Sequence, residues 1–252
     1  MKVEGTDDGA VAAAGVGPTG VSPFVSKVLA PGDIVLDLNS TNKVLRVGSG
    51  LRQDGDSILA TKAGKLRFQK QSNKYWVEGS QKRYIPNVED TVVGIMVDRR
   101  SEMFILDIGG PAFGSLPILA FEGATRRNIP NLQIGAAVYA RVVNAHRDSD
   151  PELSCTDAAG KSAGFGPLKG GFIFDCSTGL ARGLLSKPTP PVLEVLGKSL
   201  SFEIAVGLNG RVWVNAPKVA TIITVSNAIQ NAEFLSPTQQ HIMVKKLLED
   251  SQ

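Results

Sequence analysis

The stretch that most constrains the fold of this 252-residue chain runs from Tyr84 to about Asp157. It consists of short apolar runs separated by glycine, proline and asparagine, which are typical turn residues. The strand-like runs are, in order, Val92–Val97, Met103–Ile108, Ala136–Val143 and Glu152–Thr156. Short strands with tight connections predict a small closed β-barrel of the five-stranded OB type.

Two pairs of arginines lie in predicted loops of this barrel. Arg99 and Arg100 occupy the first hairpin, and Arg126 and Arg127 occupy a later loop. OB barrels bind nucleic acid on their second and third strands and on the adjoining loops. Because one guanidinium group can donate two hydrogen bonds to one phosphate, we predict that all four arginines contact nucleic-acid phosphates.

The segment before the barrel, residues 23–83, is predicted to be a small β domain that follows a disordered tail, residues 1–22. Runs such as Ile34–Leu38 alternate with turns, and nothing in the segment suggests chemistry. Seven cations gather at its end, interrupted only by Glu78: Lys62, Lys65, Arg67, Lys70, Lys74, Lys82 and Arg83. Such a run more often marks a solvated face than a nucleic-acid surface, and both interpretations stay open.

The segment after the barrel is predicted to be an α+β module. A strand at Gly170–Phe174 precedes two short helices, Ser177–Leu185 and Val192–Gly197, which a hairpin and two further helices follow. The order β-α-α-β-β-α, with an extra helix, is that of a KH-like module. The whole chain is therefore predicted to be mainly β, with an OB-fold barrel at 84–158 and a KH-like domain at 159–252.

The hairpin of this module turns at Asn209-Gly210. We predict a three-residue loop with Gly210 in the left-handed conformation, because this register places Val206, Val212 and Val214 on one face. The last helix is predicted to begin after Ser236, with Gln239 completing a capping box. Four of its side chains are predicted to face inward: Ile242, Met243, Leu247 and Leu248.

Candidate catalytic groups are sparse. The two histidines, His146 and His241, lie in polar surroundings, and no phosphate-binding loop or zinc motif is present. Asp107 and Glu122 could form a carboxylate pair, but acids beside glycine at strand ends usually support turns. We therefore predict no enzymatic activity, no catalytic residue, no metal and no cofactor.

The two cysteines, Cys155 and Cys176, lie in apolar, strand-like contexts without metal-binding spacing. They are interpreted as reduced core residues, which fits a cytosolic or nuclear compartment. No apolar run reaches the length of a membrane span, so no membrane contact is expected. The acidic N-terminus is unlike a signal peptide.

Five runs carry a more specific pattern: Tyr75–Val77, Gln81–Pro86, Asp107–Gly110, Phe121–Asn128 and Gly207–Val214. Together they closely resemble the eukaryotic RNA exosome cap subunits, of the exosome component 3 type. The similarity covers the chain from about Pro31 to its end. Its most specific pieces are Phe121–Asn128 and the Gly-x-Asn-Gly of Gly207, Asn209 and Gly210.

The resemblance implies an N-terminal β domain, an S1-type RNA-binding barrel and a KH domain, in that order. It also implies a non-catalytic subunit that, with two other cap subunits, sits on a ring of six RNase PH-like subunits. Such a subunit guides single-stranded RNA into the central channel for 3′–5′ degradation and processing, including rRNA processing. The implied locations are the nucleus, with the nucleolus, and the cytoplasm; no small-molecule substrate is implied.

The chain departs from an RNA-binding S1–KH protein in two ways. The Gly-x-x-Gly loop that clamps RNA between the first two KH helices is replaced by Ser186–Pro191, which has no glycine. Gly207 and Gly210 have the Gly-x-x-Gly spacing but lie in a β-hairpin, so we interpret them as a turn and packing device. The KH module is therefore interpreted as a docking element. The second departure is a shortage of aromatic side chains for base stacking on the barrel, which offers Phe104, with Phe113 and Phe121 as further candidates.

A platform with so few aromatics predicts weak binding directed at the RNA backbone. Three other large aromatics in β segments are expected to pack in the protein: Trp76, Trp213 and Tyr84. Two alternatives differ from the cap-subunit hypothesis. A free-standing S1/KH regulator of translation or RNA processing would need a working KH clamp, and a phosphorolytic nuclease would carry these modules beside catalytic domains, in the opposite order.

Overall fold

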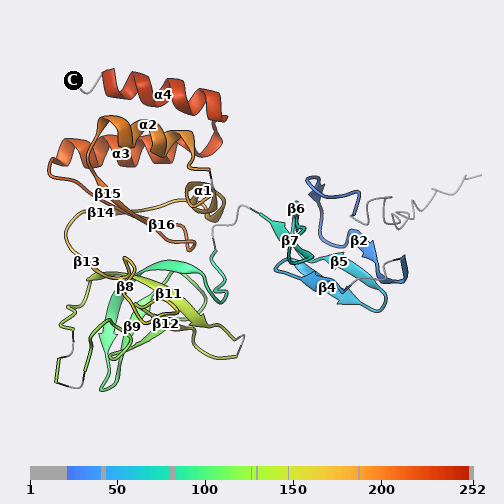
Figure 1. Ribbon diagram of the computed structural model, residues 1–252, viewed down its shortest axis with the longest axis horizontal. Helices are drawn as coiled ribbons and strands as arrows, with labels where there is room; N and C mark the ends of the chain where they lie inside the picture. The colour runs from blue at the N-terminus through green and yellow to red at the C-terminus, as the bar shows by residue number, and fades with distance from the viewer. Residues whose placement is uncertain are drawn as a thin grey trace, which may run out of the picture. The chain divides into compact units, whose positions relative to one another are not determined.

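The computed structural model describes residues 22–40, 44–79, 83–125, 127–128, 130–146, 148–186 and 188–249. Apart from Ser22, the predicted disordered tail lies outside the described residues. The chain divides into two compact units, Met1–Ser80 and Gln81–Gln252, which are described separately (Figure 1).

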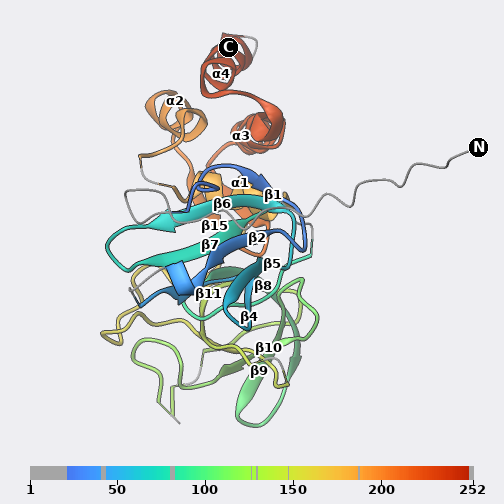
Figure 2. The ribbon, with the colours of Figure 1, turned by 90° about the vertical axis from the view of Figure 1, so that its right-hand side faces the viewer.

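The N-terminal unit consists of two small β-sheets over one core, as predicted. Its strands are β1 (Val28–Leu29), β2 (Ile34–Asp37), β3 (Arg46–Val47), β4 (Leu51–Asp54), β5 (Ser57–Ala60), β6 (Gly64–Gln69) and β7 (Lys74–Glu78), with the 3-10 helix η1 (Leu38–Ser40) after β2. One sheet has the order β1-β6-β7-β3 and the other β2-β5-β4. Figure 2 labels β6 and β7 of the first sheet and the three strands of the second. Leu36 and Ile58 of one sheet and Leu66 and Tyr75 of the other share the buried core.

The second unit begins with the predicted barrel. Its strands are β8 (Thr91–Arg99), β9 (Met103–Asp107), β10 (Gly114–Pro117), β11 (Ala137–Asn144) and β12 (Glu152–Ser154). The sheet order is β12-β10-β9-β8-β11, and pairing of β12 with β11 closes it; β13 (Gly166–Leu168) pairs with the start of β11. The strand β10 was not predicted from the sequence, because Gly-Ser-Leu-Pro contains only one large apolar residue, Leu116. The side chain of Leu116 is fully buried.

The KH-like part follows in the predicted order. Its elements are β14 (Phe172–Asp175), α1 (Thr178–Leu184), α2 (Pro191–Ser199), β15 (Glu203–Val206), β16 (Arg211–Asn215), α3 (Val219–Asn231), the 3-10 helix η2 (Ala232–Phe234) and α4 (Pro237–Glu249). The sheet order is β14-β16-β15, and one face of this sheet packs on the helices (Figure 1). No helix in the described part of the chain is long and apolar enough to cross a membrane.

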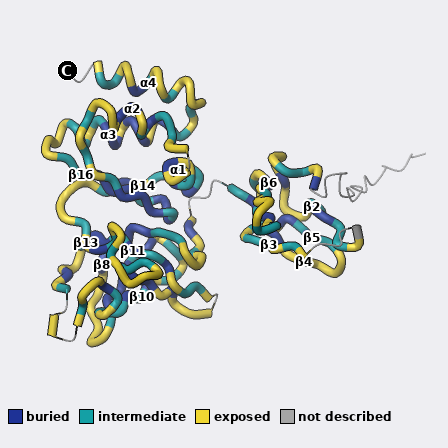
Figure 3. Tube along the Cα trace, in the orientation of Figure 1, coloured by how far each residue is buried: buried dark blue, intermediate teal, exposed yellow. Residues whose placement is uncertain are grey.

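The hairpin between β15 and β16 has the predicted register. Val206 pairs with Val212, Ile204 pairs with Val214, and Gly210 has a φ of 81°. Val206, Val212 and Val214 are therefore buried in the core that the sheet shares with the helices. Figure 3 shows the strands of this sheet largely in the colour of buried residues. The opposite face carries Trp213, which packs in a small cluster with Val93 of the barrel.

The start of the last helix was also predicted correctly. The Ser236 N–H donates to Gln239 Oε1 at 2.9 Å, and the Gln239 N–H donates to Ser236 Oγ at 3.5 Å, which is a capping box. The prediction for Ile242 was wrong, because its side chain is 67% exposed. Val244 is the buried residue of this helix instead, since the inward stripe is rotated toward it.

Candidate nucleic-acid interface

The first arginine pair lies at the tip of the β8–β9 hairpin. Arg99 is the last residue of β8, and the Arg100 N–H donates to the Met103 carbonyl at 2.8 Å, which closes the turn. Asp98 supports it by accepting a hydrogen bond from the Arg99 N–H at 2.8 Å. Both arginines are exposed, so their side chains are available to a phosphate.

The second arginine pair belongs to the segment Phe121–Asn128. Phe121 anchors this segment in the barrel core, and Thr125 and Asn128 form an isolated bridge that turns the chain between them. Arg127 is exposed, whereas Arg126 lies outside the described residues. The described half of the predicted pair is therefore presented on the surface by a short, tight turn.

The chain enters the two arginine-bearing segments from the same end of the barrel. Pro117 at the end of β10 pairs with Met103 at the start of β9, and the next residue, Ile118, donates its N–H to the Glu102 carbonyl at 3.1 Å. Glu122 ties the second segment to a later loop by accepting the Ser162 N–H at 2.9 Å. Hydrogen bonding by Ser162 keeps the pKa of the Glu122 carboxyl below its usual value.

Phe104 was wrongly predicted to stack on a base. It pairs with Arg99 on one side and Leu116 on the other, and its ring is 0% exposed in the barrel core. The period of two along β9 points Phe104 and Leu106 inward, so the outward positions of this strand are Met103, Ile105 and Asp107. The guanidinium carbon of Arg99 lies 5.6 Å from the centre of the Phe104 ring, so Phe104 supports the arginine instead.

The other two aromatic candidates, Phe121 and Phe113, differ in their exposure to solvent. Phe121 is also in the core, at 8% exposure, but Phe113 in the β9–β10 connection is 52% exposed. Phe113 precedes β10 and therefore lies at the opposite end of β9 from Arg100. Acidic residues accompany the arginines, since Asp98 and Glu102 flank the hairpin tip. A mixed-charge surface with one exposed aromatic fits weak, backbone-directed binding.

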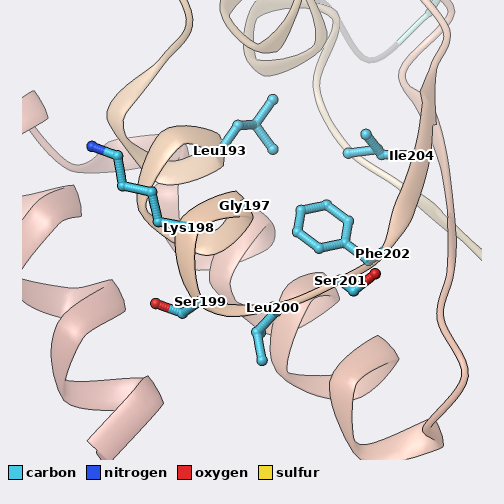
Figure 4. A pocket seen from close by; sticks show the side chains of 8 residues that line it. All are labelled: Leu193, Gly197, Lys198, Ser199, Leu200, Ser201, Phe202 and Ile204. Atoms are coloured by element: carbon cyan, nitrogen blue, oxygen red, sulfur yellow. The ribbon is translucent and has the colours of Figure 1, made fainter.

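The KH-like part lacks a clamp at the usual place. The connection between α1 and α2 runs from Leu185 to Pro190, and Lys187 in it lies outside the described residues. An open hollow beside α2 is lined by apolar side chains such as Leu193, Leu200 and Phe202 (Figure 4). Its cation, Lys198, is paired with Glu194 at 2.6 Å, so nothing in the hollow resembles a phosphate site.

The Gly-x-Asn-Gly hairpin joins the KH-like part to the barrel. Asn209 is buried; its amide nitrogen donates to the carbonyls of Val93 at 2.8 Å and Ile108 at 2.9 Å, and its amide oxygen accepts the Val93 N–H at 3.2 Å. A Cβ at position 207 would meet the Val93 nitrogen at 2.6 Å and the Asn209 side chain. The prediction that Gly207, Asn209 and Gly210 form a turn and packing device agrees with these contacts.

Arg211, directly after this hairpin, adds an ion pair that sequence reasoning did not identify. It donates to the Asp107 carbonyl at 2.6 Å and to Asp107 Oδ2 at 2.7 Å, and only 14% of its side chain is exposed. Partial burial raises the pKa of Asp107, but hydrogen bonds from Arg211 and from the Gly109 N–H, with the arginine charge, outweigh it and hold the pKa below its usual value. Asp107 therefore supports the interface between barrel and KH-like part.

The groups that could do chemistry are isolated from one another. Within the described ranges, no group of three or more His, Cys, Asp or Glu side chains could hold a metal ion. Burial raises the pKa of both the Cys155 and the Cys176 thiol to about 12, which suppresses their reactive thiolate form. His146 is exposed.

The β-sandwich-like unit, the S1-type barrel and the KH-like part define an RNA-binding protein of the S1–KH class. Family models match the chain at residues 84–166 (exosome complex component RRP40, S1 domain), 171–220 (KH domain) and 45–83 (exosome complex exonuclease Rrp40, N-terminal domain).

Similar proteins include exosome complex component RRP40 from three organisms. The identity is 40% to the Schizosaccharomyces pombe protein (87% of this chain, 93% of the relative), 40% to the Drosophila melanogaster protein (82% and 90%) and 39% to the Mus musculus protein (80% and 75%). This chain belongs to the exosome complex component RRP40 family. A crystal structure described as an exosome complex RNA-binding protein, 20% identical, has the same fold, with a TM-score of 0.54 over 67% of this chain and 99% of that one.

Proposed function

We propose that this protein is a non-catalytic cap subunit of the RNA exosome. It stabilises the ring and guides single-stranded RNA into the central channel for 3′–5′ degradation and processing, including that of rRNA. The observation that carries the proposal is the similarity to RRP40 proteins along all three parts of the chain. The same similarity offers no support for a free-standing regulator.

The barrel end that carries Arg99, Arg100 and Arg127 is the proposed RNA contact. Arg126, which lies outside the described residues, is assigned to the same contact from the sequence alone. Two observations support this assignment. The described arginines are exposed, and the hydrogen bond from Ile118 to Glu102 shows that both segments start from the same end of the barrel. Phe113 is the one aromatic candidate on the described barrel surface for stacking on a base. RNA contacts of this kind are weak in one subunit and add up when several subunits share one RNA strand.

The KH-like part is proposed to dock on the RNase PH-like ring subunits and, with the N-terminal unit, to hold the barrel beside other cap subunits. The hairpin supports a docking role, because its glycines are used to pack against the barrel and not to clamp RNA. The proposed locations are the nucleus, with the nucleolus, and the cytoplasm.

The proposal is tested with the assembled exosome. Replacing Arg99, Arg100, Arg126 and Arg127 together by glutamine should shorten the protection of a single-stranded RNA by the complex without preventing assembly. The matched control replaces the same four residues by lysine, which keeps the charge but removes the two-donor fork. Unchanged RNA protection by the glutamine variant would show that the arginine assignment is wrong.

A second experiment tests the non-catalytic role. The purified protein should leave a labelled RNA intact and should co-purify with RNase PH-like subunits when expressed with them. RNA cleavage by the pure protein that disappears when Asp107 or Glu122 is replaced by the corresponding amide would contradict the proposal.

A further inference from the structure

The outer face of the sheet β1-β6-β7-β3 gathers part of the basic run noted in the sequence. Strand pairing sets Lys65 opposite Glu78, Arg67 opposite Trp76 and Gln69 opposite Lys74, while Arg46 lies beside Lys74. Directly paired residues share a face, so four cations surround one indole ring. The alternate residues, such as Leu66 and Tyr75, point into the core.

The charge of the N-terminal unit is divided between its two sheets. Arg46, Lys65, Arg67 and Lys74 on the first sheet are exposed, and the single acid on this face is Glu78. The described part of the second sheet and its turns is net acidic, with two cations, Arg52 and Lys62, and four aspartates: Asp33, Asp37, Asp54 and Asp56. Because both sheets cover one core, the two signs face different directions, and the first face attracts anions.

We propose that this basic β-face, defined by Arg46, Lys65, Arg67, Lys74 and Trp76, binds single-stranded RNA. Cations that follow the backbone around an aromatic ring are the arrangement with which proteins bind single strands without sequence preference. Two of the five residues of this face are lysines, a residue type that is depleted in protein interfaces, whereas tryptophan and arginine occur in both kinds of interface.

Trp76 and Arg67 supply the two kinds of contact. Trp76 is partly exposed at the centre of the face, where a base can stack on its indole ring. Arg67 donates from Nε to Glu78 Oε2 at 2.6 Å, which holds the guanidinium beside the tryptophan. The bond to Glu78 engages Nε, and the two terminal nitrogens of the guanidinium can turn to a phosphate. This second RNA contact goes beyond the proposed function, which places RNA on the barrel.

Tryptophan fluorescence of the full chain provides the measurement. The chain has two tryptophans, and Trp213 is only 5% exposed, with its indole N–H donating to the Gly170 carbonyl at 2.8 Å. An oligouridylate of roughly 16 nucleotides, the upper end of the site size of one nucleic-acid-binding fold, should quench Trp76. W76F should abolish the quenching and retain the emission of Trp213.

Charge variants test the cations. K65Q/K74Q should lower the slope of log affinity against log salt by about 1.4, the value expected for two lost phosphate contacts on a single strand. K245Q/K246Q, which removes two exposed charges from α4, is the matched control and should leave the Trp76 quenching curve unchanged. W76L should weaken oligouridylate binding about tenfold, the loss expected for one stacked base.

The barrel variant R99Q/R100Q separates this inference from the proposed function, because it should leave the quenching of Trp76 intact. Absence of quenching, or equal effects of K65Q/K74Q and K245Q/K246Q, would overturn the inference whatever the barrel does. A third outcome would also overturn the inference: K65Q/K74Q binds RNA normally but no longer co-purifies with other exosome subunits. The basic β-face would then be a protein-docking surface.

Discussion

The Gly207–Gly210 hairpin and the Arg99–Glu102 turn both carry residues that bind nucleic acid in other proteins, but they lie in opposite environments. Asn209 in the hairpin is 7% exposed, and its amide group makes three hydrogen bonds to the barrel backbone. Arg99 and Arg100 in the turn are exposed. The polar side chain of the hairpin joins two parts of the protein, whereas the arginine side chains of the turn are open to solvent.

The difference shows that glycine spacing is a weak guide to function by itself. A Gly-x-x-Gly loop binds RNA when its backbone is exposed at a helix start. Here the two glycines allow a close approach to Val93 and a left-handed turn at residue 210. Mutations in the two regions should therefore change different properties.

N209A should have the largest effect, on stability. It would leave the N–H and carbonyl of Val93 and the carbonyl of Ile108 without their partner, at a cost of about 3 kcal/mol for three buried backbone groups. In a unit of this size, that lowers the melting temperature by roughly 10 °C. The melting temperature is measured by thermal unfolding followed by circular dichroism. N231A, at the exposed end of α3, is the control, and an equal change in both variants would remove the contrast with the arginine turn.

R211K should have an intermediate effect. Lysine keeps the charge but cannot donate to the Asp107 carbonyl and carboxylate in the same way, so we expect a loss of about 1–2 kcal/mol in urea denaturation. R52K, on the exposed strand β4, should change the midpoint little, because its ion pair with Asp54 is long and solvated. If R211K has the stability of the wild type, the pairing of Arg211 with Asp107 does not stabilise the interface.

The ion pair of Asp107 should add a small pH dependence. The folded pKa of Asp107 lies below 3.8, so its stabilisation is present above pH 3.8 and disappears as the pH falls through the folded value. The effect should stay below about 1 kcal/mol, because 39% of the Asp107 side chain is exposed. Unfolding midpoints between neutral and acidic pH should fall less steeply for D107N than for the wild type. Parallel curves would show that Asp107 is not the titrating group.

R99Q/R100Q should have the smallest effect on stability, within about 0.5 kcal/mol, because both side chains are exposed. Its effect should appear in RNA binding instead, where each lost phosphate contact lowers the salt slope by about 0.7. Urea denaturation and RNA titrations at several salt concentrations, performed on the same preparation, measure both properties. A large loss of stability with unchanged RNA binding would reverse the comparison.

Local patterns predicted the elements of the chain well. The Asn-Gly turn and the capping box at Ser236 each depend on neighbours within a few residues, and the structure confirms the hairpin register and the cap. The strand β10 was missed because its pairing partners lie in β9 and β12, and its own four residues give little signal.

The candidate site was less predictable than the fold. Phe104 was misplaced because the direction of a side chain on a short strand depends on the register of its neighbours, here Arg99 and Leu116. The pairing of Arg211 with Asp107 joins residues that are 104 positions apart, and no local pattern reports such a contact.

The sequence by itself determined which segments form strands and helices and where the chain turns, because these choices rest on local conformational preference and on the period of apolar residues. It also determined the family, through the runs Phe121–Asn128 and Gly207–Val214. Only the tertiary structure decided that the Gly-x-Asn-Gly hairpin is buried against the barrel, and that Lys65, Arg67 and Trp76 share one exposed face. Burial and shared faces arise from packing between distant segments, and that packing decides whether a polar group is used inside the protein or remains open to RNA.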